Sequence, residues 1–210
     1  MTLSKMAACG WLACTLGLAL AGAFDDFFRA VSVDDAGTVE RLLQRGFEVN
    51  ARDENGQPAL LLAMRDGAFG TAQTLLKHPQ IQIDAVNAAG ETALMMAALK
   101  GHLEWTQRLL ERGAGLEREG WTPLHYAATG PEPAVVQLLL ERGAGVDVRS
   151  PNGSTPLMMA ARYGAEEAVT LLLSRGADPR LRNQRDMNAA DFARSAGRES
   201  LTARLEQAAR

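Results

Sequence analysis

Histidine, serine and cysteine side chains are common carriers of catalysis, and in this sequence they form no catalytic pattern. The three histidines are His78, His102 and His125. The sequence contains no Gly-x-Ser-x-Gly motif of a nucleophilic serine, no glycine-rich phosphate loop and no histidine and cysteine set at metal-ligand spacing. We therefore expect a protein that is not an enzyme and that holds no cofactor and no metal.

Both cysteines, Cys9 and Cys14, lie in an N-terminal segment that has the pattern of an export signal. Lys5 is the only charged residue before Asp25, an apolar run follows it, and small residues satisfying the Ala-x-Ala pattern close the run. This order of a basic start, an apolar middle and small residues is typical of a secretory signal peptide. We predict a signal peptide over residues 1–23.

The alternative is that this segment is retained as an inner-membrane anchor facing the periplasm. Residues 6–24 are uncharged and approach the minimum length of a membrane-spanning helix. Gly10, Gly17 and Gly22 interrupt the run, so cleavage is the favoured interpretation. A cleaved chain would lack cysteine, which suits an oxidising compartment, and the many Ala, Gly and Arg residues are typical of bacteria. We therefore expect a periplasmic protein.

The charge of the chain argues against nucleic acid as a partner. The formal net charge is −3, whereas a phosphate backbone demands a basic surface. The sequence also has no polybasic segment that would hold it on an anionic membrane once the signal is removed.

A nine-residue pattern recurs along the chain. Copies begin at Gly90, Gly120 and Gly153, with a partial copy at Gly56. The first three are 30 and 33 residues apart, and Gly56 lies 34 residues before Gly90. A second pattern, Leu-Leu-x-Arg-Gly-Ala, follows each of the three full copies and begins at Leu109, Leu139 and Leu172. A period of this length indicates stacked repeats.

The repeated residues resemble the ankyrin family. Thr-Pro-Leu-His-Tyr-Ala-Ala at Thr122–Ala128 and Gly-His-Leu-Glu at Gly101–Glu104 are similar to its signature, and the resemblance covers about residues 24–210. It implies an all-α ankyrin-repeat solenoid of about six helix-turn-helix units with β-hairpin-like finger loops. The spacing places the units at about 24–52, 53–86, 87–116, 117–149, 150–182 and 183–210.

Local signals mark where the helices of a unit begin and end. Thr92, Thr122 and Thr155 are expected to cap first helices, and Pro123 and Pro156 to occupy their first turn. Second helices are expected to end at glycines in the left-handed conformation, namely Gly46, Gly113, Gly143 and Gly176. Gly113 and Gly120 are only 7 positions apart, whereas Gly143 and Gly153 are 10 apart, so the finger between the first pair should be three residues shorter.

The resemblance also implies where a partner would bind. Ankyrin partners usually meet the finger tips and the exposed, concave face of the first helices. The candidate residues at those positions are Trp121, Arg162, Tyr163, Arg65, Lys100 and Arg149. An exposed tryptophan near arginine and tyrosine has the composition of an interface hot spot. The alternative is that Trp121 folds over its own short finger.

Other residues that could do chemistry fit structural roles in this fold. His125 is the signature histidine, which the resemblance assigns to hydrogen bonding within the repeat. Met95, Met96, Met158 and Met159 are soft metal ligands in principle, but Met95 and Met158 hold the same position two units apart. Helices pack about 8–10 Å apart, so that column is too long for one metal ion, and core packing is favoured. Arg52, Arg149 and Arg182 share a finger position and are either a basic edge or solvated charges.

These observations favour a non-catalytic, monomeric interaction module. We expect it to be exported to the periplasm and to bind a partner protein through its concave face and finger tips, as an accessory or protective factor for an envelope enzyme. The alternatives are an inner-membrane-tethered scaffold and a toxin-neutralising, immunity-like protein.

Overall fold

The structure is a computed structural model that describes residues 22–210. The described residues divide into two compact parts, an N-terminal part that ends at Gln82 and a C-terminal part of Ile83–Arg210. The expected signal peptide lies outside the described residues except for residues 22 and 23, which belong to a helix that extends to residue 32. Within the described residues, we find no helix with the length and apolar character needed to cross a membrane.

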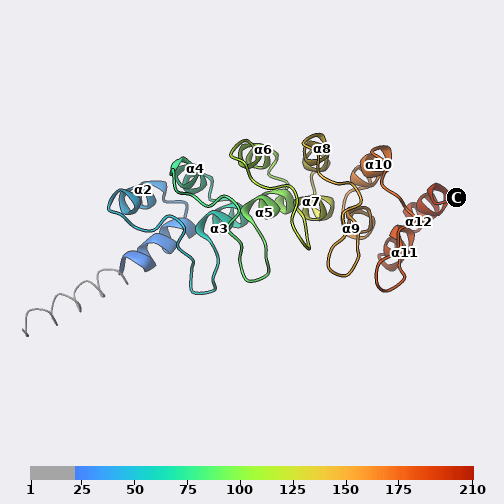
Figure 1. The fold of residues 1–210 in the computed structure, drawn as a ribbon, viewed down its shortest axis with the longest axis horizontal. Helices are drawn as coiled ribbons and strands as arrows, with labels where there is room; N and C mark the ends of the chain where they lie inside the picture. The colour runs from blue at the N-terminus through green and yellow to red at the C-terminus, as the bar shows by residue number, and fades with distance from the viewer. Residues whose placement is uncertain (1–21) are drawn as a thin grey trace, which may run out of the picture. The chain divides into compact units, whose positions relative to one another are not determined.

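The N-terminal part consists of two helix pairs (Figure 1). The helix of residues 22–32 precedes α2 (Ala36–Gln44), and α3 (Ala59–Asp66) precedes α4 (Phe69–Lys77). The first helix packs on the loop that follows α2, since the rings of Phe27 and Phe47 lie 4.5 Å apart between centroids.

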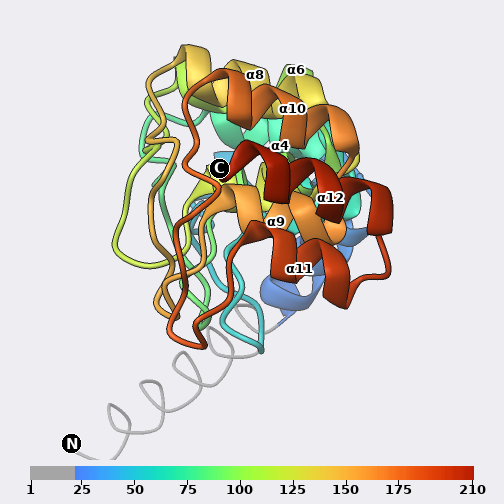
Figure 2. The same cartoon turned by 90° about the vertical axis from the view of Figure 1, so that its right-hand side faces the viewer.

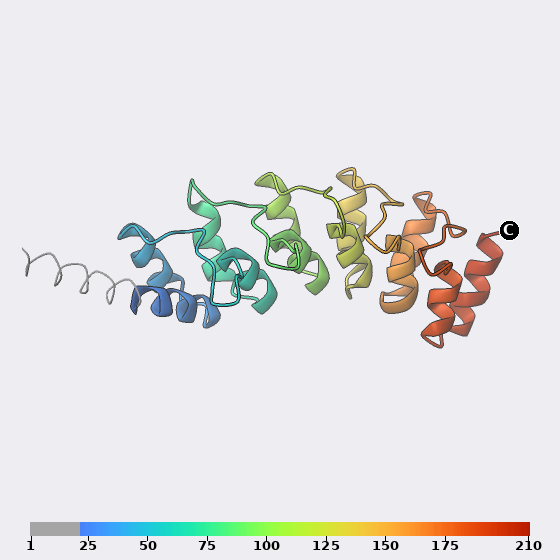
Figure 3. The same ribbon diagram turned by 60° about the horizontal axis from the view of Figure 1, so that its bottom comes forward.

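The C-terminal part consists of four helix pairs. In chain order the helices are α5 (Ala93–Lys100), α6 (Leu103–Glu111), α7 (Pro123–Thr129), α8 (Pro133–Glu141), α9 (Pro156–Tyr163), α10 (Glu166–Ser174), α11 (Ala189–Ser195) and α12 (Glu199–Ala208). The first helices α5, α7, α9 and α11 pack side by side, and α6, α8 and α10 form a second row (Figures 2 and 3). The all-α architecture is as expected: residues 22–210 contain no extended strand, only an isolated bridge between Arg52 and Pro58.

Small residues allow the first helices of the C-terminal part to pack closely. Ala127 and Ala128 on α7, and Ala160 and Ala161 on α9, are almost completely buried. Leucine, valine, alanine and Phe192 from α7 to α12 form one buried cluster with Ala98 of α5, so each of these pairs covers the apolar face of its neighbour. The core is therefore continuous from α7 to α12.

Most of the predicted helix signals act as expected; Thr122 is the N-cap residue of α7, but its hydroxyl contacts the His125 ring instead of a helix amide. The Thr92 and Thr155 hydroxyls accept hydrogen bonds from the Met95 and Met158 amides at 3.3 and 3.4 Å. Pro123 and Pro156 are the first residues of α7 and α9. The glycines expected to end second helices have φ angles of 87 to 95°: Gly46, Gly113, Gly143 and Gly176.

The buried methionines belong to the core, as predicted. Met95, Met96 and Met158 are at most 5% exposed and lie among apolar side chains, and Trp105 is also buried. Met159 differs, because it is only partly buried.

Most finger loops close by one repeated hydrogen-bond pattern. The backbone amides of Asp53, Asn87, Ser150 and Asn183 each donate to the carbonyl four residues later. The Asp53, Asn87 and Asn183 side chains also accept backbone amides within the same turn, which rigidifies the tip.

The arginines at the shared finger position brace these loops. Arg52 and Arg149 donate to the carbonyls of Gly56 and Gly153 at 2.9 and 3.4 Å, and Arg182 donates to that of Asp186. Arg149 also donates to the Arg182 carbonyl at 2.9 Å, which joins two neighbouring fingers. The guanidinium groups therefore have a structural role in addition to whatever charge they present.

A ladder of side-chain acceptors links successive repeats at the base of the fingers. One side chain per step accepts a backbone amide from the next repeat: Asn50 from Gln82, Asp84 from Gly115, Glu117 from Gly145 and Asp147 from Asp178. These bonds are 2.8 to 3.2 Å long. The ladder fixes the spacing of the fingers that flank the site described next.

Candidate functional site: an apolar groove on the first helices

An apolar groove of about 220 Å³ opens on the first helices of the C-terminal part. Its lining comes from α5, α7 and α9 and from Trp121, two residues before α7: Leu99, Trp121, His125, Tyr126, Thr129 and Met159. Three of these residues occupy the His or x position of the repeated Thr-Pro-Leu-His-x-Ala pattern, namely His125, Tyr126 and Met159. The repeat therefore places them on one face of consecutive units.

Trp121 forms one wall of this groove. It is half-buried, and its ring meets the His125 ring edge-on at 5.2 Å between centroids and 76° between planes. The two interpretations of the sequence each describe part of this arrangement. Trp121 packs against its own repeat, and its remaining surface lines the groove.

His125 is a structural residue beneath the groove. Its Nδ1 atom lies 3.2 Å from the Thr122 amide and 3.0 Å from the Thr122 hydroxyl, and its Nε2 atom lies 3.0 Å from the Ser154 carbonyl. A neutral ring with its proton on Nε2 satisfies all three contacts. Burial lowers the pKa of His125 to about 4, so the ring stays neutral near pH 7. Its hydrogen bonding within and between repeats is the role that the resemblance implied.

Tyr126 holds the side of the groove nearest the preceding finger. Its hydroxyl donates to Oε1 of Glu91 at 2.9 Å, and the Asn87 amide donates to Oε2 at 2.7 Å. Burial, followed by the hydrogen bond to Glu91, raises the pKa of Tyr126, so the phenol remains protonated. The tyrosine side chain is thus held in place where it lines the groove.

Two of the predicted site residues are exposed cations beside the groove. Lys100 follows Leu99 at the end of α5, and Arg162 lies one helical turn after Met159 on α9. The Arg162 guanidinium carbon lies 5.1 Å from the centre of the Tyr163 ring, and Tyr163 is 56% exposed. Tyr163 and Arg162 therefore form an exposed pair at the C-terminal end of α9, as Lys100 lies at the C-terminal end of α5.

The other two predicted residues do not belong to this groove. Arg65 lies in the N-terminal part and forms a two-bond ion pair with Asp66, at 2.7 and 2.8 Å. Arg149 lies in a finger and is held by carbonyls of its own and the following finger.

Tyr126 and Met159 are groove residues that the sequence pattern did not indicate. Both occupy the variable position of the Thr-Pro-Leu-His-x-Ala register, four residues after the capping threonines Thr122 and Thr155. That position is only partly buried in these two repeats, but in the preceding repeat it holds the buried Met96, so comparing the copies would not have identified the groove residues. Met159 had been assigned to the core with the other methionines.

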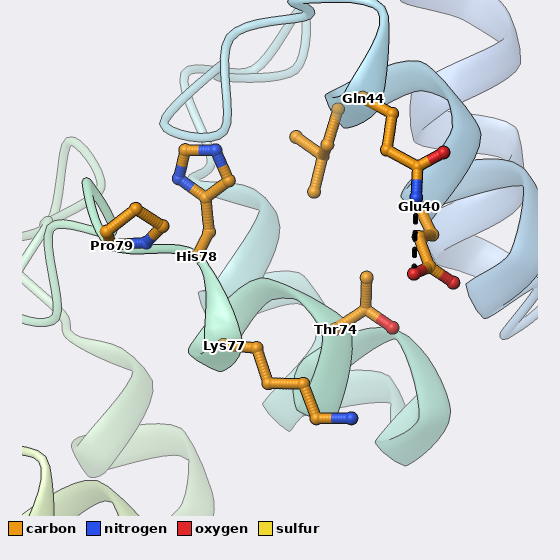
Figure 4. Close-up of a pocket in the computed structure, with 7 residues that line it drawn as sticks. Glu40, Gln44, Thr74, Lys77, His78 and Pro79 are labelled. Carbon is orange, nitrogen blue, oxygen red and sulfur yellow. Dashed lines mark hydrogen bonds between the residues drawn. The ribbon is translucent and has the colours of Figure 1, made fainter.

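A second cavity, of about 330 Å³, lies in the N-terminal part between α2 and α4 (Figure 4). It is lined by Glu40, Leu43, Gln44, Thr74, Lys77, His78 and Pro79. The Gln44 amide is bound to Glu40 at 3.4 Å, and Nδ1 of His78 accepts the Gln80 amide at 3.3 Å. These polar groups are engaged with their own chain and do not converge on one point in the cavity.

Comparison with known families decides the class of the chain. The family model for ankyrin repeats (3 copies) matches residues 27–119 and 113–183. The chain belongs to the ankyrin-repeat family. The ankyrin-repeat solenoid expected from the sequence is thereby confirmed, and family members of this kind are protein-interaction modules.

This ankyrin-repeat protein is similar to short stretches of much longer relatives. It is 34% identical over 105 residues to ankyrin repeat and SAM domain-containing protein 6 from Mus musculus, covering 48% of this chain and 12% of that protein. It is 39% identical over 72 residues to the poly [ADP-ribose] polymerase tankyrase of Caenorhabditis elegans, covering 33% of this chain and 3% of that protein. The similarity therefore concerns the repeats alone.

Among the solved structures that match the ankyrin-repeat protein, one covers 87% of its length. It is a chain from the complex of the predatory endopeptidase Bd0816 of Bdellovibrio bacteriovorus with the immunity protein Bd3460. The TM-score is 0.74 at 26% sequence identity, and the match covers 87% of this chain and 97% of that chain.

Within residues 22–210, histidine, cysteine, aspartate and glutamate side chains do not gather in groups of three or more that could hold a metal ion.

Proposed function

We propose that this protein is exported to the periplasm, where it binds a partner enzyme of the cell envelope and protects the cell from it. The contact surface is the first-helix face of the C-terminal part together with the finger tips. The chain itself supplies no catalytic group in this proposal.

The observation that carries the proposal is the likeness to the chain from the endopeptidase and immunity-protein complex. That chain is matched over 97% of its length, so the likeness is to a small protein made almost entirely of repeats. The curated relatives, in contrast, are matched over 12% of their length or less. The matched chain belongs to a complex of a peptidase with an immunity protein. This likeness supports a protective role over a scaffolding one.

The local structure supports binding without rearrangement. Finger tips are closed by side-chain and backbone hydrogen bonds, and the groove residues Tyr126 and His125 are fixed by partners of their own. A preorganised surface loses little conformational entropy on binding, so a modest contact area can give useful affinity.

Export rests on the N-terminal sequence pattern of residues 1–23. It is tested by cell fractionation followed by N-terminal sequencing of the isolated protein. A mature chain that begins near Phe24 in the periplasmic fraction supports export with cleavage. An intact N-terminus in the membrane fraction supports the tethered alternative.

Partner binding is tested by affinity capture from the envelope fraction of the source cells with the tagged protein. We expect one enzyme to be recovered at a fixed stoichiometry and to lose activity when the protein is added back in equimolar amount. Recovery of an enzyme whose activity is unchanged would contradict protection. Recovery of no stoichiometric partner would contradict the binding function itself.

A further inference from the structure

We propose that the apolar groove receives one protruding loop of the partner, which inserts a single large apolar side chain flanked by carboxylates. This inference rests on the proposed protein-binding function and names the chemistry of the partner at that site. It follows from the length of one finger, the size and lining of the groove, and the charges beside it.

The short finger leaves the groove accessible. The finger between Gly113 and Gly120 is three residues shorter than that between Gly143 and Gly153, and it ends nearer the helices than its neighbours do (Figure 1). Trp121 directly follows this finger and lines the groove. A segment projecting from a partner can therefore enter between the longer fingers and reach Trp121.

The size of the groove fits one side chain. Sites for drug-sized ligands and cofactors usually measure about 300–1,000 Å³. This groove is about 220 Å³, and its walls are aromatic, aliphatic and thioether surfaces. Burying one aromatic or leucine side chain here would supply the desolvated centre that interface hot spots require.

The charges beside the groove select carboxylates. Lys100 and Arg162 are exposed on the two helices that flank α7, and neither forms an ion pair with a carboxylate of residues 22–210. Lys100 is the residue next to Leu99, and Arg162 lies one helical turn beyond Met159, so acidic groups on either side of an inserted side chain would meet these cations.

The nearby acidic residues already have donors. The Glu91 carboxylate accepts from Tyr126 and Asn87. The Glu132 carboxylate accepts from the Ala134 amide at 3.2 Å at the start of α8. These two carboxylates keep their negative charge, but each already accepts hydrogen bonds from this chain, whereas Lys100 and Arg162 have no carboxylate partner within residues 22–210.

The test uses three cyclic peptides that differ only at the tip, carrying Asp-Phe-Asp, Lys-Phe-Lys or Asp-Ser-Asp. Each is titrated into the purified protein while the NMR signal of the Trp121 indole N–H is followed. The signal is assigned by its loss in Trp121→Phe. We expect the Asp-Phe-Asp peptide to shift this signal and to bind at least tenfold more tightly than either other peptide.

A charge-swap variant makes the test specific. Lys100→Glu/Arg162→Glu should reverse the preference, so that Lys-Phe-Lys binds more tightly than Asp-Phe-Asp. The matched control is Arg112→Glu/Arg142→Glu, at the ends of the second helices α6 and α8, which should leave the preference unchanged. Tighter binding of the Lys-Phe-Lys peptide by the charge-swap variant would also show that this variant is folded.

Three outcomes would overturn the inference. The first is equal affinity for all three peptides, and the second is a preference that the charge swap does not reverse. The third is occupation of the groove by a second copy of the chain, which sedimentation would detect as a dimer that Trp121→Ala dissociates. Affinity capture distinguishes failure of the groove proposal from failure of the proposed partner-binding function. If Lys100→Glu/Arg162→Glu recovers the partner as well as the unaltered protein does, the chain binds an enzyme but not through this groove.

Discussion

The Nε2 atom of His125 lies 3.0 Å from the backbone carbonyl of Ser154, so a ring in one repeat is hydrogen-bonded to the finger of the next. Burial holds the pKa of this ring near 4, although the bond to Ser154 opposes that shift, and the neutral ring leaves Nδ1 free to accept from the Thr122 amide. The cost of charging this buried ring makes the stability of the fold sensitive to pH.

The stability of the protein should therefore fall as pH is lowered from about 6.5 to about 4. Below pH 6.5 the unfolded chain takes up a proton on this histidine, whereas the folded chain resists it until about pH 4. The contribution is fully present above the unfolded pKa and is lost through that window, amounting to about 3 kcal/mol. Urea unfolding followed by circular dichroism at pH 7, 5.5 and 4.5 measures it.

The matched variant for this prediction is His125→Met, because Met158 occupies the equivalent position one repeat later. It should be less stable than the unaltered protein at pH 7 by about 1 kcal/mol, the value of a typical hydrogen bond. It should also lose less stability between pH 6.5 and 4. A pH profile parallel to that of the unaltered protein would show that His125 is not the titrating group.

Gly164→Ala should destabilise the protein by about 3 kcal/mol, at the upper end of the cost of overpacking. A β-carbon at this position would lie 2.1 Å from the backbone carbonyl oxygen of Ala128, where no flexible side chain can yield. The end of α9 would have to separate from α7. The change in thermal midpoint measures the effect.

Gly37→Ala is the control for that substitution. A β-carbon on Gly37, inside α2, would meet only side-chain atoms at 3.6 Å. Helix propensity then favours alanine, so stability should rise by roughly 0.5–1 kcal/mol. Equal effects of the two alanines would contradict the close approach of α7 and α9.

Arg198→Ala should cost about 2 kcal/mol. One nitrogen of Arg198, Nη1, donates to the carbonyls of Ala160, Ala161 and Gly164 at 2.8 to 3.1 Å, at the end of α9. A cation there satisfies orphan carbonyls and opposes the negative end of the helix dipole. Urea midpoints should show this loss, with the exposed finger residue Arg185→Ala staying within about 0.5 kcal/mol of the unaltered protein.

Asp147→Asn should leave stability unchanged or raise it at pH 7. Burial, together with the neighbouring Asp178 carboxylate, raises the pKa of Asp147, while the Asp178 amide bond opposes this. Because the raised pKa means that the folded state disfavours the charge, stability falls as pH rises through that pKa, and an amide avoids the penalty. Asn50 fills the equivalent ladder position and accepts the Gln82 amide at 2.8 Å, so an amide can make the bond.

Asp84→Asn at the preceding ladder step is the comparison for Asp147→Asn. Its carboxylate accepts the Gly115 amide at 3.0 Å. Chemical denaturation at pH 7 measures the free energy of unfolding of both variants. A loss of more than 1 kcal/mol in Asp147→Asn would mean that the charge itself strengthens the ladder.

Much of the fold was determined by the sequence alone, because its signals are local and repeated. Capping threonines, prolines at first helical positions and left-handed glycines each act within a few residues, as Thr155, Pro156 and Gly176 illustrate. The buried methionines Met95 and Met158 were also correctly assigned, since equivalent positions in a stack have equivalent surroundings.

Only the tertiary structure decided which side chains share the groove. Tyr126, Met159 and Leu99 come from three repeats, and they meet because α5, α7 and α9 pack side by side. The sequence likewise could not show that the finger arginines, such as Arg149, are held by finger carbonyls. The physical reason is that a repeat period fixes the position of each residue within its unit, whereas contacts between units depend on how closely neighbouring helices approach.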